Sequence, residues 1–144
     1  DGSELENIKN MIDKYDLKNN VNLLGRKPSS DMPKYFSKSD ALIVTLKDEE
    51  ILRVTLPAKV QSYMAAGKPI VAAISGEGNR IIKESNCGLV CEAEDYIKLS
   101  ENILRLFNMS EDKISELGRN GKKYFNNNFT REKLLIQLEK IINV

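Results

Sequence analysis

The sequence has no histidine and no tryptophan, and its 144 residues include only two cysteines, Cys87 and Cys91. Without histidine the chain cannot supply a Ser/His/Asp or Cys/His catalytic arrangement, and a zinc site is disfavoured because imidazole is a main zinc ligand. Along a strand the two cysteines would lie roughly 13 Å apart, whereas a disulfide requires Cα atoms within about 7 Å. We therefore expect two reduced cysteines, as in a cytoplasmic protein.

The net charge is close to zero, and long apolar runs are absent from the sequence. The chain has 22 basic and 21 acidic residues, a formal net charge of +1, so electrostatics give no reason to expect nucleic acid as a partner. No apolar run approaches the ~20 residues of a membrane-spanning helix. What remains is an ordinary globular composition, 41% apolar and 30% charged, at a length typical of one domain.

Strands and helices are expected to alternate along most of the chain. Apolar runs predict strands over 21–24, 41–45, 70–73 and 88–91. Helical spacing and capping residues predict helices at 4–15, from about 31, from 57, and at 79–85, 95–108, 111–127 and 130–143. This alternation predicts an α/β domain with a Rossmann-like parallel sheet and helices on both faces. Ligands of such sheets bind beyond the carboxyl ends of the strands.

Residues 57–71 form the most informative segment. Pro57 suits the first position of a helix because its φ is fixed and it has no N–H to leave unpaired. The amides of Ala58–Val60 then have no intrahelical acceptor and lie at the positive end of the helix dipole, which suits a phosphate. Gly67 is expected as a left-handed C-cap, and residues 70–73 as a buried strand. The segment predicts an anion-binding helix start that leads into a central strand.

This segment resembles one found in family 4 retaining glycosyltransferases of the GT-B fold. The run Tyr-Met-Ala-Ala-Gly-Lys-Pro-Ile-Val at 63–71 is similar to a segment in their C-terminal half. Pro57-Ala58-Lys59 resembles the Pro-Ser-Lys variant of bacterial transferases that build surface polysaccharides. Further segments that resemble the family follow in its order at 1–5, 21–25, 40–44, 87–90 and 127–130.

The resemblance implies that residues 1–144 are a nucleotide-sugar-binding domain, the C-terminal half of a GT-B fold without its first two strands, with C-terminal helices from about residue 95. Such an enzyme transfers a hexose or an amino-sugar from a nucleotide-diphosphate donor to a glycan or lipid-linked acceptor, with no metal or other cofactor. The acceptor site is expected in a preceding N-terminal domain, so this chain alone is expected to be inactive. The expected location is cytoplasmic, or peripheral at the inner membrane through that domain.

Donor-binding residues are predicted at the helix start and in the loops that follow the strands. Lys59 and Ser62 share a helix face. We expect Lys59 to contact the diphosphate and Ser62 to lie near the ribose. The alternative is that Lys59 is a solvent-exposed lysine and Ser62 a small polar residue without a ligand. Arg26 and Arg53 could contact a base, phosphate or sugar, because guanidinium groups stack and form bidentate bonds. Glu77 could accept hydrogen bonds from sugar hydroxyls. The alternative for each of the three is a surface residue without a ligand. The predicted set is Arg26, Arg53, Thr55, Leu56, Ala58, Lys59, Val60, Ser62 and Glu77.

The chain departs from the resembled family at two acidic positions. The family usually has two glutamates separated by seven residues, and the second holds the ribose; Val54 and Ser62 stand there in this chain. Gln61 or Glu50 would have to replace the missing ribose contact. A second hypothesis is therefore a non-catalytic Rossmann-like module that binds an anion or a partner protein.

The order of the strands raises a question about the edge of the sheet. In the resembled fold the order is 3-2-1-4-5-6, so strands 21–24 and 41–45 are not neighbours. Unpaired backbone groups are rarely tolerated when buried, and exposed edges recruit other chains. We expect either direct pairing of 21–24 with 41–45, or self-association with a second copy.

Overall fold

The computed structural model describes residue 2 and residues 4–142, and the chain divides into two compact units, Asp1–Lys34 and Tyr35–Val144. The first unit contains α1 (Leu5–Lys14) and a 3-10 turn, η1 (Ser29–Asp31). α2 (Met32–Lys38) begins at its end.

The predicted strand at residues 21–24 is wrong. The segment forms no strand, and Val21, Leu23 and Leu24 are exposed. A strand needs a hydrogen-bonded neighbour, and no described segment of the chain pairs with this one. Direct pairing with the next strand, the first of the two expected outcomes, is therefore wrong as well.

A parallel sheet forms the centre of the second unit. Its strands β1 (Leu42–Thr45), β2 (Ile70–Ala73) and β3 (Gly88–Cys91) lie in that order, with both pairings parallel. β2 is buried along its whole length because it lies between the other two strands and is covered on both faces. The predicted α/β class with a parallel sheet is confirmed.

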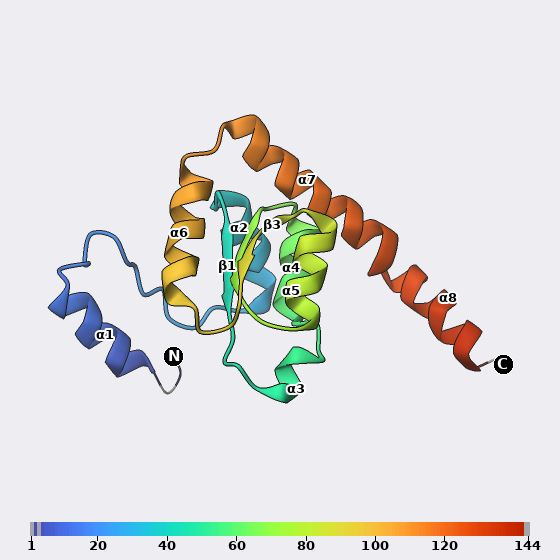
Figure 1. The fold of residues 1–144 in the computed structure, drawn as a ribbon, viewed down its shortest axis with the longest axis horizontal. Helices are drawn as coiled ribbons and strands as arrows, with labels where there is room; N and C mark the ends of the chain where they lie inside the picture. The colour runs from blue at the N-terminus through green and yellow to red at the C-terminus, as the bar shows by residue number, and fades with distance from the viewer. Residues whose placement is uncertain (1, 3, 143–144) are drawn as a thin grey trace. The chain divides into compact units, whose positions relative to one another are not determined.

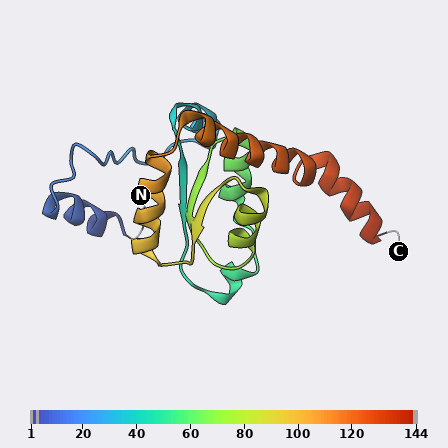
Figure 2. The same cartoon turned by 45° about the horizontal axis from the view of Figure 1, so that its top comes forward.

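Helices cover both faces of this sheet (Figures 1 and 2). α4 (Ala58–Ala66) and α5 (Glu77–Ser85) pack on one face, and α6 (Tyr96–Phe107) packs on the other. α7 (Glu111–Asn128) contributes to the apolar clusters of both faces, and α8 (Arg131–Ile142) follows it. The predicted end of this last helix at residue 143 lies outside the described residues.

The alternation of side chains along the strands produces two apolar clusters. Val44, Ile70 and Ala72 point toward α4 and α5, where they meet the buried side chains Val60, Met64, Ile74, Ile81, Ile82 and Cys87. On the other face, Val71 packs with Leu106 and Leu117. Both cysteines are free, as expected, and both are buried.

The turn around α4 follows its sequence closely. Gly67 adopts the left-handed conformation (φ +69°) and donates its N–H to the carbonyl of Met64 at 3.0 Å, which confirms the predicted cap. Pro57 lies one position earlier than expected, as the N-cap with an extended backbone, because the helix begins at Ala58. The predicted cap at Asn79 is wrong: α5 begins at Glu77, two residues earlier.

Candidate functional site

The starts of α4 and α5 lie together at the carboxyl edge of the sheet. A Cβ on Gly78 would lie 3.2 Å from Cδ of Pro57 and 2.7 Å from Cδ1 of Ile74. The first turn of α5 therefore packs directly on the residue that precedes α4. Since both helices begin here, the positive ends of two helix dipoles lie side by side.

The first turn of α4 offers fewer amides than the sequence suggested. The N–H of Val60 donates to the carbonyl of Pro57 at 2.9 Å, so the expectation that this amide is unpaired is wrong. The first turn closes as a 3-10 turn, a common variation at helix ends. Among residues 4–142, the amides of Ala58 and Lys59 have no backbone acceptor. They are the two amide donors left for an anion.

Lys59 and Ser62 both lie on the exposed face of α4. The Ser62 hydroxyl donates to the carbonyl of Ala58 at 3.0 Å. It keeps its oxygen lone pairs for a ligand, but its proton is used within the helix. The donor contacts of both side chains remain predictions.

Thr55 and Leu56 contribute to the shape of the segment before α4. The Thr55 hydroxyl lies 3.2 Å from the carbonyl of Ile51 and 3.4 Å from that of Leu52, so it caps the end of α3 (Glu50–Arg53). This short helix is not among the helices that the sequence predicted. Leu56 is partly buried against the apolar cluster, so a donor contact would come from its backbone.

Arg53 forms a bidentate ion pair with Asp48. Its Nε lies 2.8 Å from Oδ1 and its Nη2 lies 2.6 Å from Oδ2. The guanidinium group lowers the pKa of the Asp48 carboxyl, and a hydrogen bond from Ser75 lowers it further. The pair therefore remains charged at neutral pH, with Arg53 held beside the loop that leads to α5.

Glu77 lies in the first turn of α5 and pairs with Arg80. Two hydrogen bonds of 2.7 and 2.8 Å join the carboxylate to the guanidinium group, which lowers the pKa of Glu77. Arg80 also contacts Glu84. A contact between Glu77 and a donor sugar remains a prediction. So does the role of Arg26, which belongs to the first unit.

Asn79 is a structural residue of this edge that the sequence interpretation misplaced. Its side chain is buried, and Nδ2 donates to the carbonyls of Ile74 at 2.8 Å and Cys91 at 3.2 Å. Glu92 Oε1 lies 3.4 Å from the same nitrogen. Asn79 thus ties α5 to the ends of β2 and β3. Its only signal in the sequence is a polar residue one turn before the apolar Ile82.

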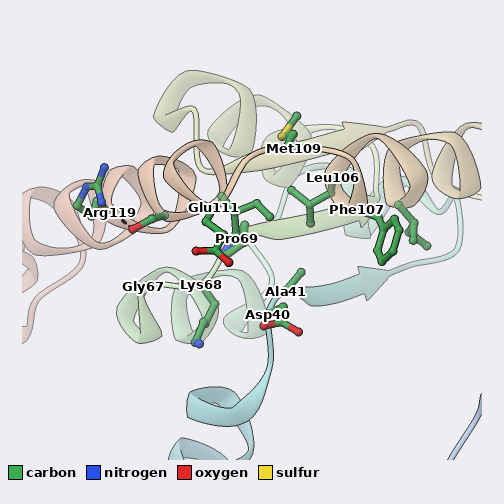
Figure 3. Close-up of a pocket in the computed structure, with 13 residues that line it drawn as sticks. Asp40, Ala41, Gly67, Lys68, Pro69, Leu106, Phe107, Met109, Glu111 and Arg119 are labelled. Carbon is green, nitrogen blue, oxygen red and sulfur yellow. Dashed lines mark hydrogen bonds between the residues drawn. The ribbon is translucent and has the colours of Figure 1, made fainter.

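A pocket of about 720 Å³ lies at the opposite, amino edge of the sheet (Figure 3). Residues around the starts of β1 and β2 line it together with the end of α6 and the start of α7; among them are Asp40, Lys68, Leu106, Phe107, Glu111 and Arg119. None of the predicted donor residues lines this pocket. A smaller pocket of about 330 Å³ lies at the carboxyl edge, between Thr45, Ala73 and Tyr96.

Within residue 2 and residues 4–142, no group of three or more histidine, cysteine, aspartate or glutamate side chains is arranged to hold a metal ion. None of the helices found in the same residues is both long and apolar enough to cross a membrane.

The fold and the paired helix starts define a Rossmann-like α/β domain. The chain belongs to the group 1 glycosyltransferases: the family described as "Glycosyl transferases group 1" matches residues 1–124. An uncharacterized glycosyltransferase from Methanocaldococcus jannaschii is 30% identical over 141 residues, which cover 98% of this chain. The chain spans 38% of that protein's length.

Two solved structures share the fold. Sucrose-phosphate synthase from Thermosynechococcus elongatus superposes with a TM-score of 0.82 at 20% identity, over 99% of this chain and 34% of that one. A mutant of S. aureus TarM, in complex with Fondaparinux, alpha-GlcNAc-glycerol and UDP, superposes with a TM-score of 0.81 at 21% identity, over 99% and 28% of the two chains. These likenesses support the predicted GT-B architecture.

Proposed function

We propose that this chain is the donor-binding part of a retaining glycosyltransferase of family 4, of the type that builds bacterial surface polysaccharides. It binds a nucleotide-diphosphate sugar, and the enzyme transfers a hexose or an amino-sugar to a glycan or lipid-linked acceptor. The observation that carries the proposal is the pair of helix starts at the carboxyl edge, with Arg53 beside them, in a chain of the group 1 family.

The donor diphosphate binds at the start of α4 in this proposal. The unpaired amides of Ala58 and Lys59 and the exposed Lys59 ammonium supply the nearest positive charge, and the Arg53 guanidinium lies on the adjoining segment. As the bond to the sugar breaks, negative charge grows on the leaving diphosphate. Donors that are already oriented toward that charge stabilise the transition state without reorganising, which is the basis of electrostatic catalysis.

Three further donor contacts belong to the proposal. Glu77, ionised beside Arg80, accepts hydrogen bonds from sugar hydroxyls. Ser62 accepts from a ribose hydroxyl through its free lone pairs, and Arg26 meets the nucleotide base. No metal or other cofactor is included in this scheme.

Substitution of Lys59 tests the proposal directly. In the full-length protein, Lys59→Ala should weaken binding of UDP or GDP by about 1–3 kcal/mol, the range for a hydrogen bond to a charged group. Calorimetry measures the change. Lys123→Ala is the matched control because Lys123 is also exposed but lies on α7. Equal affinities of the Lys59 variant and the wild type would contradict the assignment.

A second candidate function is a non-catalytic anion-binding or protein-interaction module. This candidate is favoured because the chain has no acid at the two positions where the resembled family has glutamates. Val54 stands at the first and is 74% exposed, and Ser62 stands at the second, where its hydroxyl donates to its own helix. Binding of UDP or GDP without transfer from any UDP- or GDP-sugar, in the full-length protein with lipid-linked and glycan acceptors present, would favour this candidate. Transfer of the sugar would exclude it.

We further propose that a separate domain of the protein binds the acceptor. The chain's coverage of 38% of its relative supports this. The protein would act in the cytoplasm, or at the inner membrane surface through that domain. We also propose that the 144-residue chain self-associates through the edge of β1, which lies at one side of the described sheet, since uncovered edges pair with other strands.

A further inference from the structure

Asp48 occupies only one side of the Arg53 guanidinium group. The ion pair uses Nε and Nη2. A guanidinium group has five N–H donors in a planar fork, so the edge formed by Nη1 and the second Nη2 hydrogen is left for another anion. The carboxylate thus fixes the plane of the group while leaving a second bidentate edge open.

The backbone of Arg53 packs closely against Gly76. A Cβ on Gly76 would lie 2.0 Å from the carbonyl oxygen of Arg53 and 2.5 Å from its Cα. Gly76 adopts φ +70° and ψ −136°, a conformation that is essentially restricted to glycine. Any other residue at position 76 would push Arg53 away from the start of α5.

Ser75 of the β2–α5 loop lies beside Asp48 and contributes to the lowered pKa of its carboxyl. Ser75 Oγ also accepts the N–H of Ala93 at 3.0 Å, so its position is set by the segment that follows β3. Exposed ion pairs add little to stability, so folding alone does not account for this arrangement.

We propose that Asp48 and Gly76 are positioning residues, which hold Arg53 so that its open edge receives phosphate oxygens of the donor beside the starts of α4 and α5. The inference rests on the proposed function and deepens it. An arginine side chain loses much rotamer freedom when it binds an anion. Here Asp48 imposes that loss before the ligand arrives, and Gly76 fixes the position of the backbone that carries the side chain. The alternative is competition, in which Asp48 keeps Arg53 from the phosphate.

Calorimetry with UDP and GDP on the full-length protein separates these roles. Arg53→Ala should weaken binding about tenfold, because a hydrogen bond to a charged group is lost. Asp48→Asn should weaken it about fivefold, because an amide cannot accept both N–H groups and the arginine regains its freedom. Asp48→Glu should retain more affinity than Asp48→Asn. In the Arg53→Ala background, Asp48→Asn should have no further effect, since coupled residues are not additive.

Gly76→Ala is the second, independent variant, and it should weaken UDP or GDP binding to a similar extent. Glu101→Gln is the control: it breaks an exposed ion pair of 2.7 Å with Lys98 on α6 and should leave affinity unchanged. Unchanged or tighter binding by Asp48→Asn would overturn the positioning role, and so would an additive loss in the double variant. If the wild type binds neither nucleotide, the proposed function falls and the positioning role falls with it.

Discussion

The packing of α7 on the end of α4 depends on the missing side chain of Gly118. A Cβ there would lie 2.2 Å from the carbonyl oxygen of Gly67 and 3.0 Å from its carbonyl carbon. Ordinary contacts begin at 3.4 Å, so Gly118→Ala would force the two backbones about 1.2 Å apart or distort them. Gly67 cannot move freely, because it is the left-handed cap of α4 and leads into the buried Ile70.

Two effects of Gly118→Ala oppose each other. Alanine inside a helix is more favourable than glycine by about 0.5–1 kcal/mol. Overpacking in a well-packed region costs about 1–3 kcal/mol, and the partner here is backbone, which cannot rotate away. The cost of overpacking should exceed the gain in helix propensity, so the free energy of unfolding should fall by about 1–2 kcal/mol.

Differential scanning calorimetry of the full-length protein measures this loss. The unfolding transition that includes this chain should fall by about 2–4 °C for each kcal/mol lost, the range for a domain of 150–250 residues. Asn126→Ala is the control, because Asn126 is exposed on the same helix and only helix propensity changes there. An unchanged or higher midpoint for Gly118→Ala would show that the helices separate at little cost, and the reasoning would be wrong.

Three further predictions concern the site, the thiols and the sheet edge. Ser62→Ala should change donor affinity and leave the pH profile of activity unchanged, since its hydroxyl does not titrate near neutral pH; a shifted optimum would assign it a catalytic role. Burial raises the pKa of Cys87 and Cys91, so both should resist iodoacetamide at pH 7.5 until urea unfolds the protein. Modification in the native state would contradict their burial. Sedimentation of the 144-residue chain should show concentration-dependent association that Ile43→Lys on β1 reduces; a monomer at every concentration would refute it.

The segment from α4 to β2 was predictable because its signals are local. Proline before the helix and glycine after it act through their own backbone preferences. Residues 70–73 form a continuous apolar run, as a strand covered on both faces requires. No contact from elsewhere in the chain is needed to interpret these signals, and the structure agrees with them to within one residue.

The errors occur where structure depends on distant partners. Residues 21–24 have a strand's composition, but their pairing depends on a neighbour that no described segment provides. The sequence did not predict α3, because the four charged residues 47–50 precede this helix and form its first position. The helix is stabilised by the Thr55 hydroxyl at its end and by the packing of Gly76 on the backbone of Arg53. Short helices of this kind are too short to show periodicity.

The sequence predicted that Arg53 and Glu77 lie near the carboxyl edge of the sheet, but it did not predict their ion-pair partners. The positions of Arg53 and Glu77 follow from the rule that ligands bind beyond the carboxyl ends of parallel strands. Their partners do not: Asp48 and Arg80 are local in sequence, yet several charges compete for each arginine, and sequence spacing cannot choose between them. Asn79 bridges two strand ends only because α5 packs across both.

The size of a pocket does not decide which edge of the sheet binds the donor. The pocket of about 720 Å³ at the amino edge is lined by charges of both signs, including Asp40, Glu111, Lys68 and Arg119. Lys68 there already donates to the carbonyl of Ser37 at 3.1 Å, and Arg119 to Ser115 at 2.6 Å. The pocket at the carboxyl edge is smaller, about 330 Å³, but this edge has two helix starts and a guanidinium edge that Asp48 leaves open. A diphosphate is held by converging donors, and we infer that these donors, and not the larger hollow, determine where the nucleotide-sugar binds.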